Sequence, residues 1–252
     1  NGLTKPSYLF GTVHLIDKKD FHVRPFIDSV FDSAEQVVFE IKLDDTAAFT
    51  HIQQKMFLPA GITLAGLMEP ETYGALKTYF ADSLHMDISL FNTMKPFVLI
   101  QAVTERSVRG EAQSYELYFL EKCMALNKPL LGLETIDEQL SVFDSIPFAE
   151  QIKWLVQWTN SSAQYDSTFQ DLIQAYKKED MNAIAKYMQE SAPEFMQYED
   201  LFVYDRNKRW IPQIEELIKT KSTFIAVGAG HLPGEEGLIE LLRKKKYTVK
   251  PV

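Results

Sequence analysis

The chain has 252 residues, of which 46% are hydrophobic and 24% charged, an ordinary composition for a globular protein with a sizeable core. Its formal net charge of −9 argues against a nucleic-acid backbone or an anionic membrane surface as the main partner. A single cysteine, Cys123, excludes an internal disulfide and a cysteine-based metal cluster, and no apolar run reaches the length of a membrane-spanning helix.

Five segments have the character of β-strands, and they lie mainly toward the two ends of the chain. In chain order they are 7–13, 36–43, 129–134, 222–228 and 247–252. The first and fourth are nearly continuous apolar runs, which is typical of strands covered on both faces. Helical patterns at 24–34 and in EEGLIELLRKK separate strands from one another. This alternation predicts a mostly parallel sheet joined by helical crossovers.

The rest of the chain has the periodicity of amphipathic helices, and no Pro/Gly/Ser-rich linker divides it. We therefore expect one α/β domain over residues 1–252, with a mostly parallel central sheet, flanking helices and large helical insertions. The core is expected at about 1–45, 106–136 and 220–252, and the insertions at about 46–105 and 137–219.

Four of the predicted strands end at or near a polar side chain. In chain order these side chains are His14, Glu40, Glu134 and His231. Ligands bind outside the carboxyl ends of the strands in open parallel sheets, so these residues are expected to meet. Two histidines and one glutamate are a common ligand set for a catalytic divalent metal. We predict that His14, Glu40 and His231 bind such a metal, with Glu134 as a further candidate.

Glu40 is unusual because it interrupts the apolar run VVFEI. A carboxylate in a segment covered on both sides needs a cation nearby. We therefore predict that the Glu40 carboxylate lies within about 5 Å of an imidazole of His14 or His231. In a metal-free structure it should contact an arginine or one of these histidines.

Both histidines follow a glycine in a Gly-x-x-His step, GTVH near the start and GAGH near the end of the chain. Gly11, Gly228 and Gly230 are expected to permit backbone geometries and close approaches that a Cβ would block. A nucleotide-binding loop is the rival interpretation of GAGHLPGEEG. Its glycine spacing is one residue longer than the dinucleotide fingerprint, and no P-loop Lys-Ser/Thr pair follows. The metal site is therefore favoured.

The segments KPSYLFGTVHL, FEI, LLGLETIDEQL, DRN and IAVGAGHLPGEEGLIELLRKKKYTV, in this order, resemble the TraB/GumN family, which includes the Tiki proteins. The resemblance implies a fold shared with ChaN-like and erythromycin-esterase-like proteins. It also implies a metal-dependent hydrolase, a peptidase acting on peptide or protein substrates. Manganese or cobalt is the ion implied, because Tiki proteins depend on these metals, and zinc is an alternative.

The resemblance also assigns residues. The family's functional positions fall on His14, Glu40 and His231, and its Arg-Asn step falls on Arg206 and Asn207. Arg206 would stabilise an oxyanion or grip a substrate carboxylate, with Asn207 beside it, and Glu134 or Glu40 would transfer the proton. In a metal-free structure, Arg206 is the arginine expected to contact Glu40.

Two non-catalytic functions remain as alternatives. The name TraB is attached to the shutdown of peptide-pheromone signalling, which a peptide-binding protein could achieve by sequestration. The name GumN comes from an exopolysaccharide cluster, which suggests a polysaccharide-associated accessory protein. Because the chain begins at Asn1 without methionine, we favour an exported location, periplasmic or surface-anchored, over a cytoplasmic one. The pattern of residues predicts neither an oligomeric state nor a particular substrate.

Overall fold

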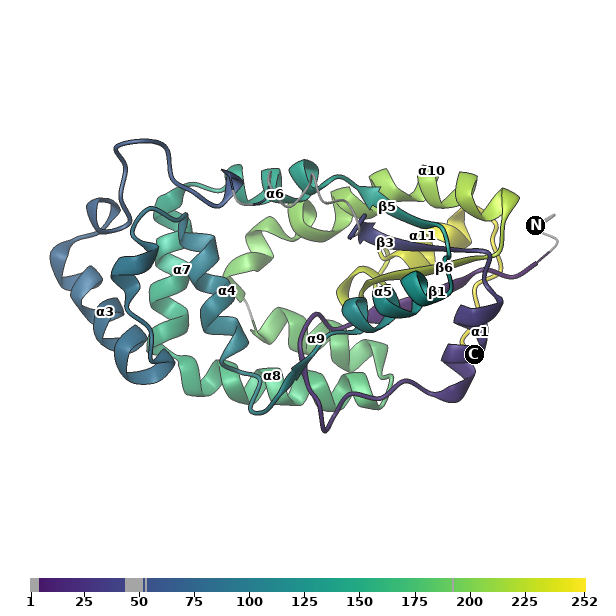
Figure 1. Cartoon of the computed structure of the whole chain (residues 1–252), viewed down its shortest axis with the longest axis horizontal. Coiled ribbons are helices and arrows are strands. Elements are labelled where there is room, and N and C mark those ends of the chain that lie inside the picture. Colours follow the sequence, from purple (N-terminus) through teal and green to yellow (C-terminus); the bar gives the residue numbers. More distant parts are fainter. Residues whose placement is uncertain (1–4, 44–51, 53, 192) are drawn as a thin grey trace. The chain divides into compact units, whose positions relative to one another are not determined.

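A four-stranded parallel sheet forms the centre of the fold in the computed structural model, which describes residues 5–43, 52, 54–191 and 193–252. The strands are β1 (Tyr8–Thr12), β3 (Gln36–Ile41), β5 (Leu130–Glu134) and β6 (Thr223–Gly228). They lie in the order β1-β6-β3-β5, and each neighbouring pair is parallel (Figure 1). The predicted α/β fold with a mostly parallel sheet is confirmed.

The two strands that precede the Gly-x-x-His histidines are direct neighbours. β1 pairs with β6 in parallel register over its whole length, from Tyr8 opposite Phe224 to Thr12 opposite Gly228. The carboxyl ends of both strands therefore lie side by side. The prediction that segments 7–13 and 222–228 form parallel neighbours is confirmed.

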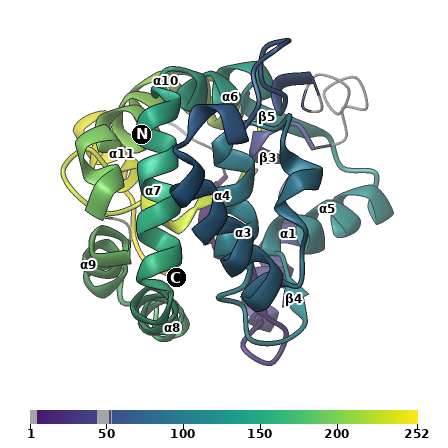
Figure 2. The same ribbon diagram turned by 90° about the vertical axis from the view of Figure 1, so that its left-hand side faces the viewer.

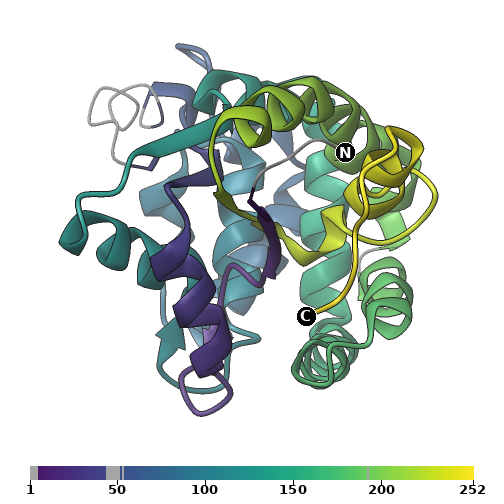
Figure 3. The ribbon, with the colours of Figure 1, turned by 90° about the vertical axis from the view of Figure 1, so that its right-hand side faces the viewer.

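Helices cover both faces of this sheet, as Figure 3 shows. They are α1 (Pro25–Ser33), α5 (Tyr115–Ala125), α10 (Asp205–Thr220) and α11 (Leu238–Lys244). On one face, Phe31 of α1 and Phe119 of α5 contact Phe224 of β6, with ring centroids 5.1 and 4.9 Å away. On the other face, Trp210 of α10 and Leu238 of α11 are fully buried in one apolar cluster with residues of the strands. The core thus consists of apolar side chains from both faces of the sheet.

The chain divides into two compact units. The first comprises Asn1–Asp44, Gly110–Thr135 and Asp171–Val252, and the second comprises Asp45–Arg109 and Ile136–Gln170. The first unit contains the sheet and also β2 (Ile16–Asp17), β4 (Ala112–Gln113), α9 (Met181–Ser191), η3 (Pro193–Tyr198), η4 (Asp200–Tyr204) and η5 (Ala229–His231). β2 and β4 form a separate antiparallel pair, which is too short to have been recognised in the sequence. The expectation of a single domain stays a prediction.

The second unit is helical. It contains η1 (Ala65–Leu67), α3 (Pro70–Leu84), η2 (Ile88–Phe91), α4 (Pro96–Glu105), α6 (Ile136–Asp144), α7 (Phe148–Asn160) and the beginning of α8 (Ser162–Lys177). α3, α4 and α7 lie side by side (Figure 2). Residues 46–51 of the expected insertion lie outside the described residues. None of the helices that the structure describes has the length and apolar character of a membrane span.

The predicted strand at 247–252 is wrong. This segment forms no strand in the structure, although Tyr247 and Val249 are half-buried and the residues after each of them are exposed. Their side chains pack against the buried cluster that includes α10 and α11. The strand-like character of this segment therefore reflects packing on helices, and Pro251 has no N–H group for a ladder.

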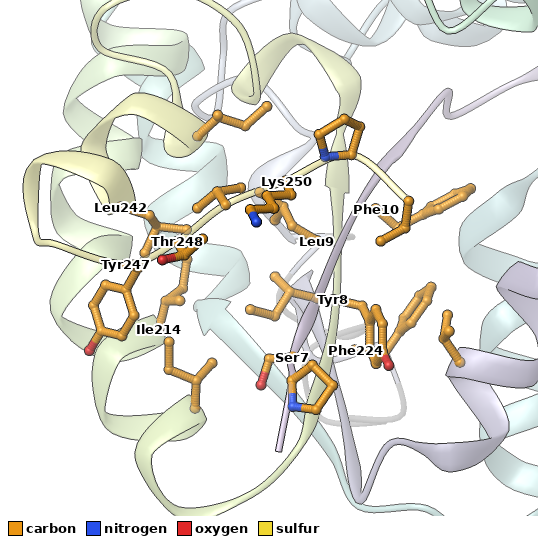
Figure 4. Close-up of a pocket in the computed structure, with 18 of the residues that line it drawn as sticks. Ser7, Tyr8, Leu9, Phe10, Ile214, Phe224, Leu242, Tyr247, Thr248 and Lys250 are labelled. Atoms are coloured by element: carbon orange, nitrogen blue, oxygen red, sulfur yellow. The ribbon is translucent and has the colours of Figure 1, made fainter. Parts of the chain in front are cut away.

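A cavity of about 520 Å³ lies beside β1, and Figure 4 shows its lining. Tyr8, Leu9 and Phe10 of β1, Phe224 of β6 and the tail Tyr247–Val252 contribute to its walls. As the structure describes it, no predicted site residue lines this cavity. The predicted site residues lie instead at the carboxyl ends of the strands.

Candidate functional site

The predicted site residues come from four strand ends and one helix start. Glu40 lies in β3, Glu134 ends β5, His14 follows β1, and His231 ends η5, directly after β6. Arg206 and Asn207 lie in the first turn of α10, after the π-helical turn η4. Because all four strands are parallel, their carboxyl ends bring these residues to one edge of the sheet, as predicted.

Arg206 joins two buried carboxylates. Its Nη2 donates to Glu40 Oε2 and to Glu134 Oε1, each at 2.6 Å, and its Nε donates to Glu134 Oε1 at 3.1 Å. The Glu134 side chain is 2% exposed and also accepts from Trp210 Nε1 at 3.3 Å. The expected contact of Glu40 with Arg206 in a metal-free chain is confirmed.

The ring of His231 is oriented by Asn207. Asn207 Nδ2 donates to the carbonyl oxygens of His231 and Glu236, which turns its Oδ1 toward His231 Nδ1, 2.7 Å away. Because an amide oxygen can only accept, Nδ1 carries the proton and Nε2 keeps its lone pair. Nε2 accepts from Arg206 Nη1 at 3.2 Å and lies 3.7 Å from Glu40 Oε1. The prediction that Glu40 lies within about 5 Å of an imidazole is therefore confirmed.

His14 has a carboxylate partner that the sequence did not reveal. Its Nδ1 lies 2.9 Å from Glu116 Oε1. Glu116 stands in the first turn of α5, and 102 positions separate it from His14. It belongs to a helix with an ordinary apolar pattern and to no recognisable motif, so no sequence signal distinguishes it from other helical glutamates.

The three predicted metal ligands surround Gly228. A Cβ at this glycine would lie 3.2 Å from Glu40 Oε1, 3.6 Å from His231 Cδ2 and 3.9 Å from His14 Nε2. The Gly228 N–H also donates to Glu40 Oε1 at 2.7 Å. The absence of a side chain thus leaves open the space that these three residues share.

The other two glycines of the motifs permit close packing. A Cβ at Gly11 would lie 2.8 Å from Leu232 Cδ1 and 3.1 Å from Ala229 Cα, and a Cβ at Gly230 would overlap Met188. Neither glycine has a left-handed backbone conformation. Glycine is needed at these two positions because neighbouring atoms pack close to the backbone, and not because the backbone has an unusual conformation.

The ionisable groups of the site have strongly altered affinities for protons. Burial alone would raise the pKa of Glu40, but His231, which is protonated in the acid range where Glu40 titrates, and Arg206, which is charged at every pH, lower it to about 2. Burial lowers the pKa of His231 to about 4, so its ring is neutral at pH 7. The hydrogen bond to Glu116 raises the pKa of His14 above 6.5. Because the His14 side chain is 71% exposed, water screens this last effect.

The residue types beside Gly228, two histidines and a glutamate, are those that bind divalent metals in other proteins. His231 has a neutral imidazole whose Nε2 accepts from Arg206, His14 Nε2 lies near Gly228, and Glu40 is ionised. Each imidazole has its Nδ1 held by a second group, which is the usual arrangement for metal-binding histidines. Within the described ranges, no three His, Cys, Asp or Glu side chains already stand at metal-ligand spacing, and Arg206 provides the positive charge next to Glu40.

Comparisons with known proteins give a family match and several relatives. The model of the TraB/PrgY/gumN family matches residues 1–251. Metalloprotease TIKI1 of Danio rerio is 24% identical over 300 residues, covering 97% of this chain and 60% of that protein. Metalloprotease TIKI1 of Homo sapiens is 23% identical, with 97% and 59% covered. An uncharacterized protein of Treponema pallidum is 23% identical, with 95% and 77% covered.

The chain thus spans about 60% of the length of these TIKI relatives. No solved structure matches it.

Proposed function

Because the chain belongs to the TraB/PrgY/gumN family, we propose that it is a metal-dependent hydrolase, and specifically a peptidase that acts on peptide or protein substrates. The observation that carries the proposal is the meeting of His14, Glu40 and His231 around the bare backbone of Gly228. Several relatives are named metalloproteases, which supports the same reaction class. The three side chains would hold a divalent ion, either manganese or cobalt, with zinc as the alternative.

A divalent ion held by such donors lowers the pKa of a bound water and polarises a carbonyl oxygen. The residues of the chain prepare the site for it. Asn207 keeps the lone pair of His231 on Nε2, and Arg206 keeps Glu40 ionised at neutral pH. Both effects exist before any substrate arrives, so little reorganisation is needed during the reaction.

Glu40 is the better placed of the two glutamates to accept a proton. Its Oε1 accepts from the Gly228 N–H at the edge of the space that the two histidines share, whereas both oxygens of Glu134 accept from Arg206 or Trp210, away from the histidines. We therefore assign proton transfer to Glu40 and the orientation of Arg206 to Glu134. Arg206 itself donates to two carboxylates, to His231 Nε2 and to the Phe202 carbonyl oxygen, so we assign it charge balance within the site. Direct substrate contact by Arg206 and Asn207 stays a prediction.

A peptide-library digest with added manganese, cobalt or zinc tests the proposed activity. We expect cleavage with at least one metal, loss of cleavage with a chelator, and loss in the Glu40→Gln and His231→Ala variants. His85→Ala is the matched control, because His85 is an exposed residue at the end of α3. Cleavage that survives both the chelator and Glu40→Gln would contradict the proposal. Peptide binding without metal uptake or cleavage would favour the sequestering alternative.

A further inference from the structure

The two histidines of the site differ in how firmly the protein holds them. The His231 side chain is 8% exposed, and its ring packs against Trp210 with centroids 4.5 Å apart. The His14 side chain is 71% exposed and follows the end of an edge strand. An exposed imidazole has several rotamers available, and packing does not select one of them. The orientation of His14 must therefore come from a specific polar contact.

Glu116 provides that contact, and it is itself rigidly held. Its Oε1 accepts from His14 Nδ1 at 2.9 Å and from Thr12 Oγ1 at 2.6 Å, while its Oε2 accepts from Ser114 Oγ at 2.9 Å. The Glu116 side chain is 17% exposed. Ser114 is also the N-cap residue of α5, because its Oγ accepts from Leu117 N. The carboxylate is thus fixed relative to the helix.

The position of Glu116 favours its ionised form. It lies in the first turn of an eleven-residue helix, where the N-terminal end of the helix dipole stabilises negative charge. An ionised carboxylate can only accept hydrogen bonds, so His14 Nδ1 must donate. This leaves the lone pair of a neutral His14 ring on Nε2, the atom that lies near Gly228.

The side chains of Thr12 and His14 both form hydrogen bonds to Glu116. They are two positions apart at the end of β1, and successive side chains of an extended chain alternate between faces. Both reach the same carboxylate oxygen. These hydrogen bonds connect the end of β1 to α5, whereas Gly228 belongs to β6 and Asn207 to α10. The two histidines are oriented by different elements and by different acceptors, a carboxylate for His14 and an amide for His231.

We propose that Glu116 is a positioning residue that holds His14 by its Nδ1–H and directs Nε2 toward Glu40 and His231 for metal binding. The proposal rests on the metal site of the proposed function. A carboxylate in this place fixes the tautomer and orientation of a ligating imidazole and raises its basicity, which the neutral amide of Asn207 does less strongly. Glu116 touches neither the metal nor the substrate in this role.

The test uses Glu116→Ala and Glu116→Gln in the whole chain, with Glu111→Gln as the control. Glu111 pairs with Lys18 on the surface, at 2.8 Å, and should be silent. Spectra of the metal-free protein are recorded above the raised pKa of His14, where its ring is neutral. The ¹⁵N shifts of His14, assigned by loss of its signals in His14→Ala, then report the tautomer. We expect the proton to favour Nδ1 in the wild type and to lose this preference in Glu116→Ala.

Titration calorimetry with manganese and with cobalt gives the second readout. We expect Glu116→Ala to bind metal about 10- to 100-fold more weakly. Glu116→Gln keeps an acceptor and a similar shape, so it should fold even where Glu116→Ala does not and should show a smaller loss. Unchanged tautomer and unchanged affinity in both variants would overturn the proposal. If the wild type binds no metal, the proposed function fails, and the ¹⁵N shifts alone then decide whether Glu116 orients His14.

Discussion

Single charged residues determine whether the site can exist at all. Glu40 and Glu134 are both buried, and their negative charges are tolerated because Arg206 donates to each of them. A buried charge without a partner costs several kcal/mol, so the three residues form one electrostatic group. The same arrangement keeps Glu40 ionised and the ring of His231 neutral, the states that a metal requires.

Arg206→Ala should therefore destabilise the fold. We expect the free energy of unfolding to fall by about 3–5 kcal/mol, because two carboxylates lose their shared cation. Urea unfolding of the metal-free protein measures this change. Arg209→Ala is the control, since Arg209 is half exposed and lies 3.9 Å from Glu134, and it should shift stability by about 0.5 kcal/mol or less. A stable Arg206→Ala protein that lacks activity would instead place Arg206 in contact with the substrate.

Gly228→Ala should separate metal binding from stability. The new methyl group would lie 3.2 Å from Glu40 Oε1 and 3.6 Å from His231 Cδ2, so it would fill the space between the ligands. We expect weaker binding of manganese or cobalt in calorimetry, with a change of about 1 kcal/mol or less in the free energy of unfolding. Gly74→Ala, in α3, meets no atom within 4 Å and should leave metal binding unchanged. If Gly228→Ala and the wild type bind metal with equal affinity, the space beside Gly228 is not needed for metal binding.

Strands and helices that depend on the local sequence pattern were predictable from the sequence, whereas features that depend on contacts between distant residues were not. The apolar runs at β1 and β6 predicted buried strands of a parallel sheet. Because the strands are parallel, the residues at their carboxyl ends lie close together. The tail at 247–252 shows the same alternation as a strand, but alternation does not reveal whether a partner edge is available. Glu116 is an ordinary helical glutamate until folding brings α5 beside the end of β1.

Gly11→Ala tests how closely β1 must approach η5. Its Cβ would lie 3.1 Å from the backbone at Ala229 and 2.8 Å from Leu232 Cδ1, so the two elements would have to move apart. We expect a loss of about 1–3 kcal/mol in the free energy of unfolding, which is typical of overpacking. Denaturant unfolding of Gly11→Ala beside Gly228→Ala measures it. A Gly11→Ala protein as stable as Gly228→Ala would contradict the close-packing explanation.

At the scale of the whole molecule, the candidate site belongs entirely to one compact unit that is assembled from three separate chain segments. Contacts in the site join residues 72, 102, 166 and 188 positions apart. Such a site does not exist in the unfolded chain, so metal binding must favour the folded state. The net charge of −9 also favours the approach of cations, in a manner that salt weakens.

Metal should consequently stabilise the whole protein against heat. A free metal concentration of 100 times the dissociation constant adds about 2.7 kcal/mol to the stability of the folded state. For a chain of this size, that corresponds to a rise of roughly 5–10 °C in Tm. Calorimetric scans with manganese, cobalt or zinc, each repeated with excess chelator, measure the effect.

The controls decide what such a shift would mean. Glu40→Gln retains the shape of the side chain but loses its charge, so we expect it to show little or no metal-dependent shift. His85→Ala should behave like the wild type, because His85 is exposed and belongs to the helical unit. If Tm rises equally in the wild type and Glu40→Gln, the metal binds elsewhere. If Tm does not change with any of the three metals, the site at the strand ends is not a metal site, and the peptide-sequestering function becomes the better explanation of this fold.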